Sequence, residues 1–163
     1  MENTRQESIE KFKSLTEKID FCMLTTINGG QLRSRPMSTQ EMQEDGTIWF
    51  FTSDRTHKVD EIEADNRVNV AYSQPNDNVY VSVAGRASIS KDRQKIEELW
   101  NPILKAWFPE GLDDPTLALL KINVEEAEYW DSPNSKIVQL YGFVKAAVTG
   151  QPAKGGEHGK INL

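Results

Sequence analysis

Two arginines, a loop rich in hydroxyl groups and a lysine follow one another closely along residues 33–58. Arg33 and Arg35 alternate with neutral residues, so an extended strand places both side chains on one face. The loop 52–56 (TSDRT) then leads to Lys58. Hydroxyl and backbone N–H groups donate to phosphate, a helix N-terminus favours an anion, and Arg and Lys neutralise its charge. The stretch therefore predicts a phosphate site, while the alternative is a solvated, charged surface.

A hairpin must position the arginines. Asn-Gly-Gly at 28–30 is a strong hairpin signal between an apolar strand at 21–27 and a returning strand at 32–40. Residues 43–46 (QEDG) have turn chemistry, since Gly46 can supply a positive φ. The β-branched and aromatic run 47–52 (TIWFFT) follows as a third strand. We expect these three strands to form an antiparallel meander.

A helix over about residues 55–65 must position the lysine. Ser53 or Asp54 can cap it, and Val59 and Ile62 have the spacing of its buried face. This arrangement places Lys58 in the first turn of the helix, close to the hydroxyl groups of the loop.

The remaining segments supply further strands and two more helical regions. Gly85 interrupts one long strand, as a bulge or bend would. Pro102 is expected to break or kink the second helical region. The predicted helices cover residues 4–19 and 91–107, and the predicted strands cover residues 67–73, 79–89, 117–124 and 127–130.

This pattern predicts a mainly β fold: a small closed barrel of about six antiparallel strands with covering helices. Closing a sheet removes its exposed edges, which favours a barrel, and periodicity alone leaves an open α+β sandwich as the alternative. We expect one domain over residues 1–148. Residues 149–163, which are rich in Gly and Pro, are expected to form a flexible C-terminal tail. The segment 136–147 fits either a helix or an extended arm.

Composition excludes several classes of function. The chain has 163 residues and a formal net charge of −6, which argues against nucleic-acid binding and against docking on an anionic membrane. No apolar run reaches the length of a membrane span, and the polar N-terminus has no signal-peptide pattern. The single cysteine, Cys22, fits a reducing cytoplasm. Two histidines and one cysteine predict no metal site.

The order Arg35-Pro36-Met37, a turn, then Phe50 to Ser53 and Thr56 to Lys58 resembles a known family. It is similar to the flavin-binding segment of the pyridoxamine 5′-phosphate oxidase-like, FMN-binding split-barrel family, and most similar to its general stress protein branch. The resemblance runs from about Ile9 to Val148. It implies a six-stranded antiparallel split β-barrel with covering helices. It also implies a homodimer with FMN, or else FAD, at the subunit interface.

The resemblance also implies which residues hold the flavin. Arg35 and Lys58 would bind the phosphate with the hydroxyls of Thr52 and Thr56, while many relatives carry Arg where this chain has His57. Arg33 shares the strand face of Arg35 but does not match the motif. The cofactor-binding residues implied are Arg35, Pro36, Met37, Phe51, Thr52, Thr56, His57, Lys58 and Trp130. No catalytic residue is predicted.

Trp130 matches a region from which the second subunit of family members approaches the flavin, with Asp131, Ser132 and Ser135 beside it. After Trp130 the chain lacks the arginine and histidine that grip the substrate in pyridoxamine phosphate oxidases. The resemblance therefore implies a flavin-dependent oxidoreductase with an unknown small-molecule substrate and a stress-related role. The alternatives are a non-catalytic flavin carrier or redox sensor, and a cofactor-free dimeric stress protein.

Overall fold

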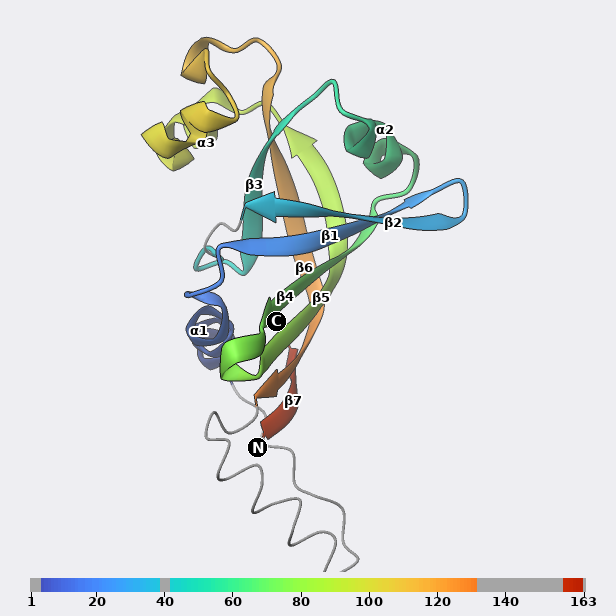
Figure 1. Ribbon diagram of the computed structural model, residues 1–163, viewed down its shortest axis with the longest axis vertical. Coiled ribbons are helices and arrows are strands. Elements are labelled where there is room, and N and C mark those ends of the chain that lie inside the picture. Colours follow the sequence, from blue (N-terminus) through green and yellow to red (C-terminus); the bar gives the residue numbers. More distant parts are fainter. Residues whose placement is uncertain (1–3, 39–41, 132–156, 163) are drawn as a thin grey trace, which may run out of the picture.

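The computed structural model describes residues 4–38, 42–131 and 157–162 (Figure 1). Its strands are β1 (Phe21–Asn28), β2 (Gln31–Ser38), β3 (Thr47–Ser53), β4 (Arg67–Gln74), β5 (Val79–Ser90), β6 (Leu117–Asp131) and β7 (Glu157–Asn162). Its helices are α1 (Arg5–Thr16), α2 (His57–Ala64) and α3 (Arg93–Leu99), and short 3₁₀ helices are η1 (Pro75–Asp77), η2 (Pro102–Ala106) and η3 (Gly111–Asp113).

One curled antiparallel sheet forms the body of the protein. Its strand order is β2-β1-β4-β5-β6-β3, and β7 pairs with β6 beside this path. The mainly β, six-stranded split-barrel prediction is therefore confirmed, with β7 as an additional strand and three flanking helices. Because β2 and β3 stand at the two ends of the path, the split in the barrel lies between them.

The predicted meander is wrong at its third strand. β3 pairs with β6, from Thr47 opposite Asn123 to Ser53 opposite Leu117, and not with β2. Burial explains the difference, because β3 is buried on both faces. Ile48 joins the main core and Trp49 joins a second apolar cluster under α3 and η2. Pairing with β2, whose outer face is exposed, would leave one apolar face of β3 in water.

Glycines set the turn and the bend that the sequence predicts. Gly29 and Gly30 join β1 to β2 with φ values of 56° and 82°, as a two-residue hairpin turn requires. Gly85 marks a bulge, since the register of β5 against β6 shifts between Ala84 and Gly85. A Cβ atom at Gly85 would collide with the backbone carbonyl oxygen of Asn123. Both predictions are confirmed.

The main core lies inside the curl of the sheet, with α1 against it (Figure 1). Thr4 caps α1 in a capping box with Glu7. The ring of Phe12 meets the ring of Tyr72 edge-on, with centroids 5.5 Å apart. The side chain of Cys22 is buried, and its Sγ donates to the backbone carbonyl of Met37 at 3.7 Å.

The helix boundaries partly correct the sequence reading. α2 begins at His57 with Thr56 as its N-cap, not with Ser53 or Asp54. Ser53 ends β3, and its carbonyl accepts a hydrogen bond from the N–H of Thr56, so a tight turn separates strand from helix. The predicted break at Pro102 is confirmed, because α3 ends at Leu99 and Pro102 begins η2.

The prediction of a flexible tail is wrong for residues 157–162. These form β7, whose Ile161 is buried in the core at 3% exposure. The reason is an uncovered edge: β6 pairs with β3 only over residues 117–123, and β7 covers its continuation at 126–131. Residues 149–156 and the ambiguous segment 136–147 lie outside the described residues. Within the described part of the chain, no helix combines the length and apolar character needed to cross a bilayer.

Candidate functional site

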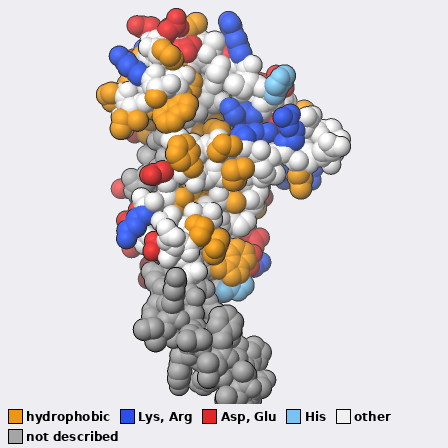
Figure 2. All heavy atoms as spheres, viewed as in Figure 1, with side chains coloured by type: hydrophobic (Ala, Val, Ile, Leu, Met, Phe, Trp, Pro, Cys, Tyr) orange, Lys and Arg blue, Asp and Glu red, His pale blue; other side chains and the backbone are white. Residues whose placement is uncertain are grey.

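A cleft of about 330 Å³ opens at the split between β2 and β3. Of the described strands, only β1 pairs with β2 and only β6 with β3, so backbone N–H and C=O groups face the split on both sides. Figure 2 shows Lys and Arg side chains beside hydrophobic side chains on this side of the molecule. The lining residues are Phe21, Pro36, Met37, Ser38, Phe51, Thr52, Ser53, Thr56, Lys58, Leu104, Trp107 and Phe108.

Lys58 provides the positive charge at one end of this cleft. Its Nζ donates to the hydroxyl oxygens of Thr52 at 2.8 Å and Thr56 at 3.3 Å. Across the described residues, no carboxylate lies within ion-pair distance of this ammonium group. Burial, followed by the charge of Arg35, lowers the pKa of Lys58. A partly desolvated ammonium held by two hydroxyls is suited to bind an anion.

Glu61 on α2 is a buried carboxylate at 6% exposure and lies one turn beyond Lys58. It accepts a hydrogen bond of 2.5 Å from the hydroxyl of Thr26, and it pairs with Arg33 at 3.0 Å and Arg35 at 2.9 Å. Burial alone would raise the pKa of Glu61. The hydrogen bond from Thr26 and the charges of Arg35 and Arg33 outweigh burial and lower that pKa. Glu61 is therefore charged and fully partnered.

Arg35 is held beside the cleft by this network. Its Nη1 donates to Thr26 Oγ1 at 2.7 Å and to the carbonyl of Leu24 at 3.4 Å, while its Nη2 donates to Glu61. The strand register explains the contacts, since Arg35 is opposite Leu24 and Arg33 is opposite Thr26. As expected, both arginines share one strand face with Met37, and that face meets α2.

Six of the nine predicted cofactor-binding residues line the cleft. These are Pro36, Met37, Phe51, Thr52, Thr56 and Lys58. Arg35 lies next to it, near enough for its charge to affect Lys58. These six residues therefore come together from two edge strands and the start of one helix, although the strands are not paired with each other.

The other two predicted residues lie elsewhere in the same chain. His57 lines a separate cavity of about 190 Å³ together with Arg33. Trp130 is on β6, is 40% exposed, and stacks on His158 of β7 with ring centroids 5.1 Å apart. Neither side chain lines the cleft of its own chain.

Sequence reasoning missed Glu61, Thr26 and the wall that η2 provides. Thr26 occupies an inward position of β1, where its neighbours Cys22 and Leu24 are apolar. A hydroxyl residue at an inward position, opposite an arginine in the hairpin, is the feature of the sequence that could have indicated a buried polar contact here. Nothing local indicated that Trp107 would reach a cleft formed by β2 and β3.

Comparison with known proteins agrees with the fold. A family model described as pyridoxamine 5′-phosphate oxidase like matches residues 7–154. The chain belongs to this family of split-barrel proteins.

Its relatives place it in the general stress protein branch. It is 33% identical to general stress protein 26 of Bacillus subtilis over 121 residues, which cover 72% of this chain and 84% of the relative. The crystal structure of a general stress protein 26 from Jannaschia is 27% identical, with a TM-score of 0.75, and the match covers 96% of this chain and 99% of that one. A general stress FMN/FAD binding protein from Xanthomonas citri is 31% identical, with a TM-score of 0.67 and coverages of 77% and 89%.

Proposed function

We propose that the protein binds FMN in the cleft between β2 and β3 and works as a flavin-dependent oxidoreductase. The observation that carries this proposal is Lys58, a partly desolvated ammonium group with two hydroxyl partners. Thr52, Thr56 and Lys58 would hold the phosphate at this end of the cleft. The Xanthomonas citri relative, described as an FMN/FAD binding protein, supports the choice of a flavin.

The charge balance also supports a phosphate. Arg33, Arg35 and Lys58 carry three positive charges against the single carboxylate of Glu61. A phosphate monoester carries a charge of about −2 near neutral pH. Its binding would therefore neutralise the network, and this favours a phosphate over a neutral ligand at this end.

The edge of β2 would hold the flavin ring. Pro36, Met37 and Ser38 line the cleft, and β2 has a paired neighbour on one side only. Backbone groups of an unpaired edge can exchange hydrogen bonds with the polar edge of a ring. When bound, the flavin supplies the hydride and electron chemistry, and the protein supplies orientation and electrostatics.

The proposed assembly is a homodimer that shares this site. The outer face of the sheet exposes Met23 at 41%, Tyr80 at 42% and Trp130 at 40%. Tyr80 and Trp130 are direct cross-strand neighbours, so their apolar areas adjoin. A second copy covering this face would bury them, and it would bring Trp130 to the flavin of the other subunit. The single cysteine, Cys22, is buried and fits the reducing cytoplasm that we propose for the protein.

A visible absorption spectrum of the purified protein tests the proposal. We expect added FMN to stay bound after dialysis, with a flavin band shifted from that of free FMN. Turnover with a nicotinamide reductant then separates an oxidoreductase from a flavin carrier. Complete loss of FMN on dialysis would overturn the proposed site and favour a cofactor-free stress protein.

A further inference from the structure

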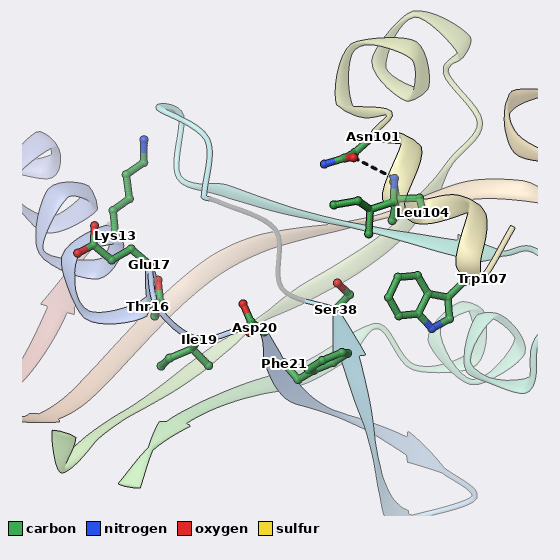
Figure 3. Close-up of a pocket in the computed structure, with 11 residues that line it drawn as sticks. Lys13, Thr16, Glu17, Ile19, Asp20, Phe21, Ser38, Asn101, Leu104 and Trp107 are labelled. Atoms are coloured by element: carbon green, nitrogen blue, oxygen red, sulfur yellow. Dashed lines mark hydrogen bonds between the residues drawn. The ribbon is translucent and has the colours of Figure 1, made fainter. Parts of the chain in front are cut away.

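A second, larger cleft of about 680 Å³ adjoins the first (Figure 3). The two clefts share four wall residues: Phe21, Ser38, Leu104 and Trp107. A molecule in the larger cleft would therefore lie next to the contents of the smaller one. Its volume is within the range of about 300–1,000 Å³ that small-molecule sites occupy.

The shared end of the larger cleft is aromatic. Trp107, which directly follows η2, and Phe21 at the start of β1 are exposed at 54% and 56%, and Ile103 of η2 is exposed at 71%. Figure 3 shows the rings of Trp107 and Phe21 near Ser38 at this end. Exposed aromatic faces at the wall of a cleft are suited to pack against a planar ring.

The side of the larger cleft that α1 and the residues leading into β1 provide carries more negative than positive charge. Glu17 and Asp20 present two carboxylates, and Lys13 presents one ammonium group (Figure 3). Across the cleft, at the start of η2, the side-chain oxygen of Asn101 accepts from the N–H of Ile103 at 3.0 Å, so its amide nitrogen is left as a donor (Figure 3). The net negative charge from Glu17 and Asp20 is opposite in sign to the charge of Lys58 in the smaller cleft, and it disfavours binding of an anion.

The position of Lys58 decides which part of a bound flavin would face the larger cleft. Lys58 and Thr56 line only the smaller cleft, whereas Phe21 and Ser38 line both. The junction is therefore at the ring end, away from the phosphate end. The adenylate of FAD is joined through the phosphate, so it would extend away from the larger cleft and leave this cleft open for another molecule.

We propose that the larger cleft binds the organic molecule with which the flavin reacts, and that this molecule is planar, aromatic and neutral or cationic. The inference rests on the proposed function, because a molecule in the larger cleft can react with the flavin only if the adjoining smaller cleft holds it. It assigns Trp107 and Phe21 to the ring of the ligand and Asn101 to a polar group on it. It excludes phosphorylated and carboxylated compounds, since Glu17 and Asp20 repel them.

A matched pair of probes tests the assignment: 2-naphthol, which is neutral at pH 7, and naphthalene-2-sulfonate, which carries one negative charge. Isothermal titration calorimetry measures the Kd of each probe for the protein with FMN and without it. We expect 2-naphthol to bind at least about tenfold more tightly than the sulfonate, because two carboxylates face one ammonium group. Trp107→Ala should abolish 2-naphthol binding, while Leu32→Ala, an exposed change on the hairpin, should leave it unchanged.

The double variant Glu17→Gln/Asp20→Asn separates charge from shape. We expect it to bind 2-naphthol normally and to bind the sulfonate several-fold more tightly than the unmodified protein does. Equal binding of both probes, or 2-naphthol binding that ignores Trp107, would overturn the inference. Trp107-dependent 2-naphthol binding in a protein that fails to retain FMN would support the cleft while overturning the proposed flavin function.

Discussion

Arg35 on β2 and Glu61 on α2 form an ion pair with Nη2 and Oε2 2.9 Å apart. The pair joins an edge strand of the split barrel to the helix that carries Lys58. Glu61 also accepts from Thr26 on β1, so three elements meet at one buried carboxylate. The separation between the phosphate end and the β2 wall of the cleft is therefore fixed by side chains, because β2 and β3 are not paired.

Lys58→Ala should weaken FMN binding by about 1.5–3 kcal/mol, the range for a hydrogen bond to a charged group. Fluorescence titration of FMN measures the change. Lys18→Ala removes an exposed ammonium group outside the cleft and should have no effect. Equal affinities of the two variants would remove Lys58 from the flavin site.

The affinity of the protein for FMN should fall with rising pH, and the fall should begin below pH 10.5. Burial and Arg35 place the pKa of Lys58 below its usual value of 10.5. A bound phosphate favours the charged form, so affinity decreases as pH rises through this lowered pKa. In the flavin-free protein, the free energy of unfolding should change in the opposite direction. The unfolded state binds the proton of Lys58 more tightly than the folded state does, so stability increases as pH rises from the lowered pKa to 10.5. The measurement is the Kd for FMN against pH.

Lys58→Arg is the control for that profile, because a guanidinium group stays charged throughout the range. The profile of this variant should be flatter than that of the unmodified protein. Identical slopes in both proteins would assign the pH dependence to another group.

Glu61→Ala should lower the free energy of unfolding by about 3–5 kcal/mol, since it leaves Arg35 and Thr26 without their buried partner. Chemical denaturation measures the loss, and Glu63→Ala, an exposed change on the same helix, should cost far less. The pKa of Glu61 is lowered from 4.5, so its contribution is present above pH 4.5 and is lost as pH falls through the lowered pKa. Glu61→Gln should lack that part of the acid dependence. Equal costs at Glu61 and Glu63 would contradict the buried network.

Met23→Lys should convert the proposed dimer into a monomer and weaken FMN binding with it. Met23 lies on the outer sheet face, between Pro36 on β2 and Ala71 on β4, and a lysine there would be buried at a cost in the proposed dimer interface. Light scattering gives the mass. Leu32→Lys, at the exposed tip of the same hairpin, should leave the mass unchanged. A monomer that binds FMN as tightly as the unmodified protein would refute the shared site.

Ile161→Ala should lower the free energy of unfolding by about 2–5 kcal/mol, the range for truncating a buried Ile. The side chain of Ile161 is in the main core, and β7 covers the edge of β6. Thermal or chemical denaturation measures the change, with the exposed Lys160→Ala as the comparison. A negligible cost at Ile161 would mean that β7 is not part of the stable fold.

The local elements follow from the sequence because their causes are local. Alternation of polar and apolar residues, Gly29-Gly30 and Pro102 each act through neighbouring residues. β7 could not be predicted because the Gly-rich sequence around it carries no strand signal. This strand forms because it pairs with the edge of β6, which is distant in the sequence.

The sequence by itself determined the strands β1 to β6, the approximate positions of the three helices, the shared face of Arg33 and Arg35, and the charge and hydroxyl groups of a phosphate site. Only the tertiary structure decided that β3 pairs with β6, which sets the split and therefore the cleft. It also decided that Glu61 holds both arginines and that Trp107 joins two clefts. The physical reason is that these arrangements depend on burial of apolar faces and charges between residues far apart in the chain, which no local pattern encodes.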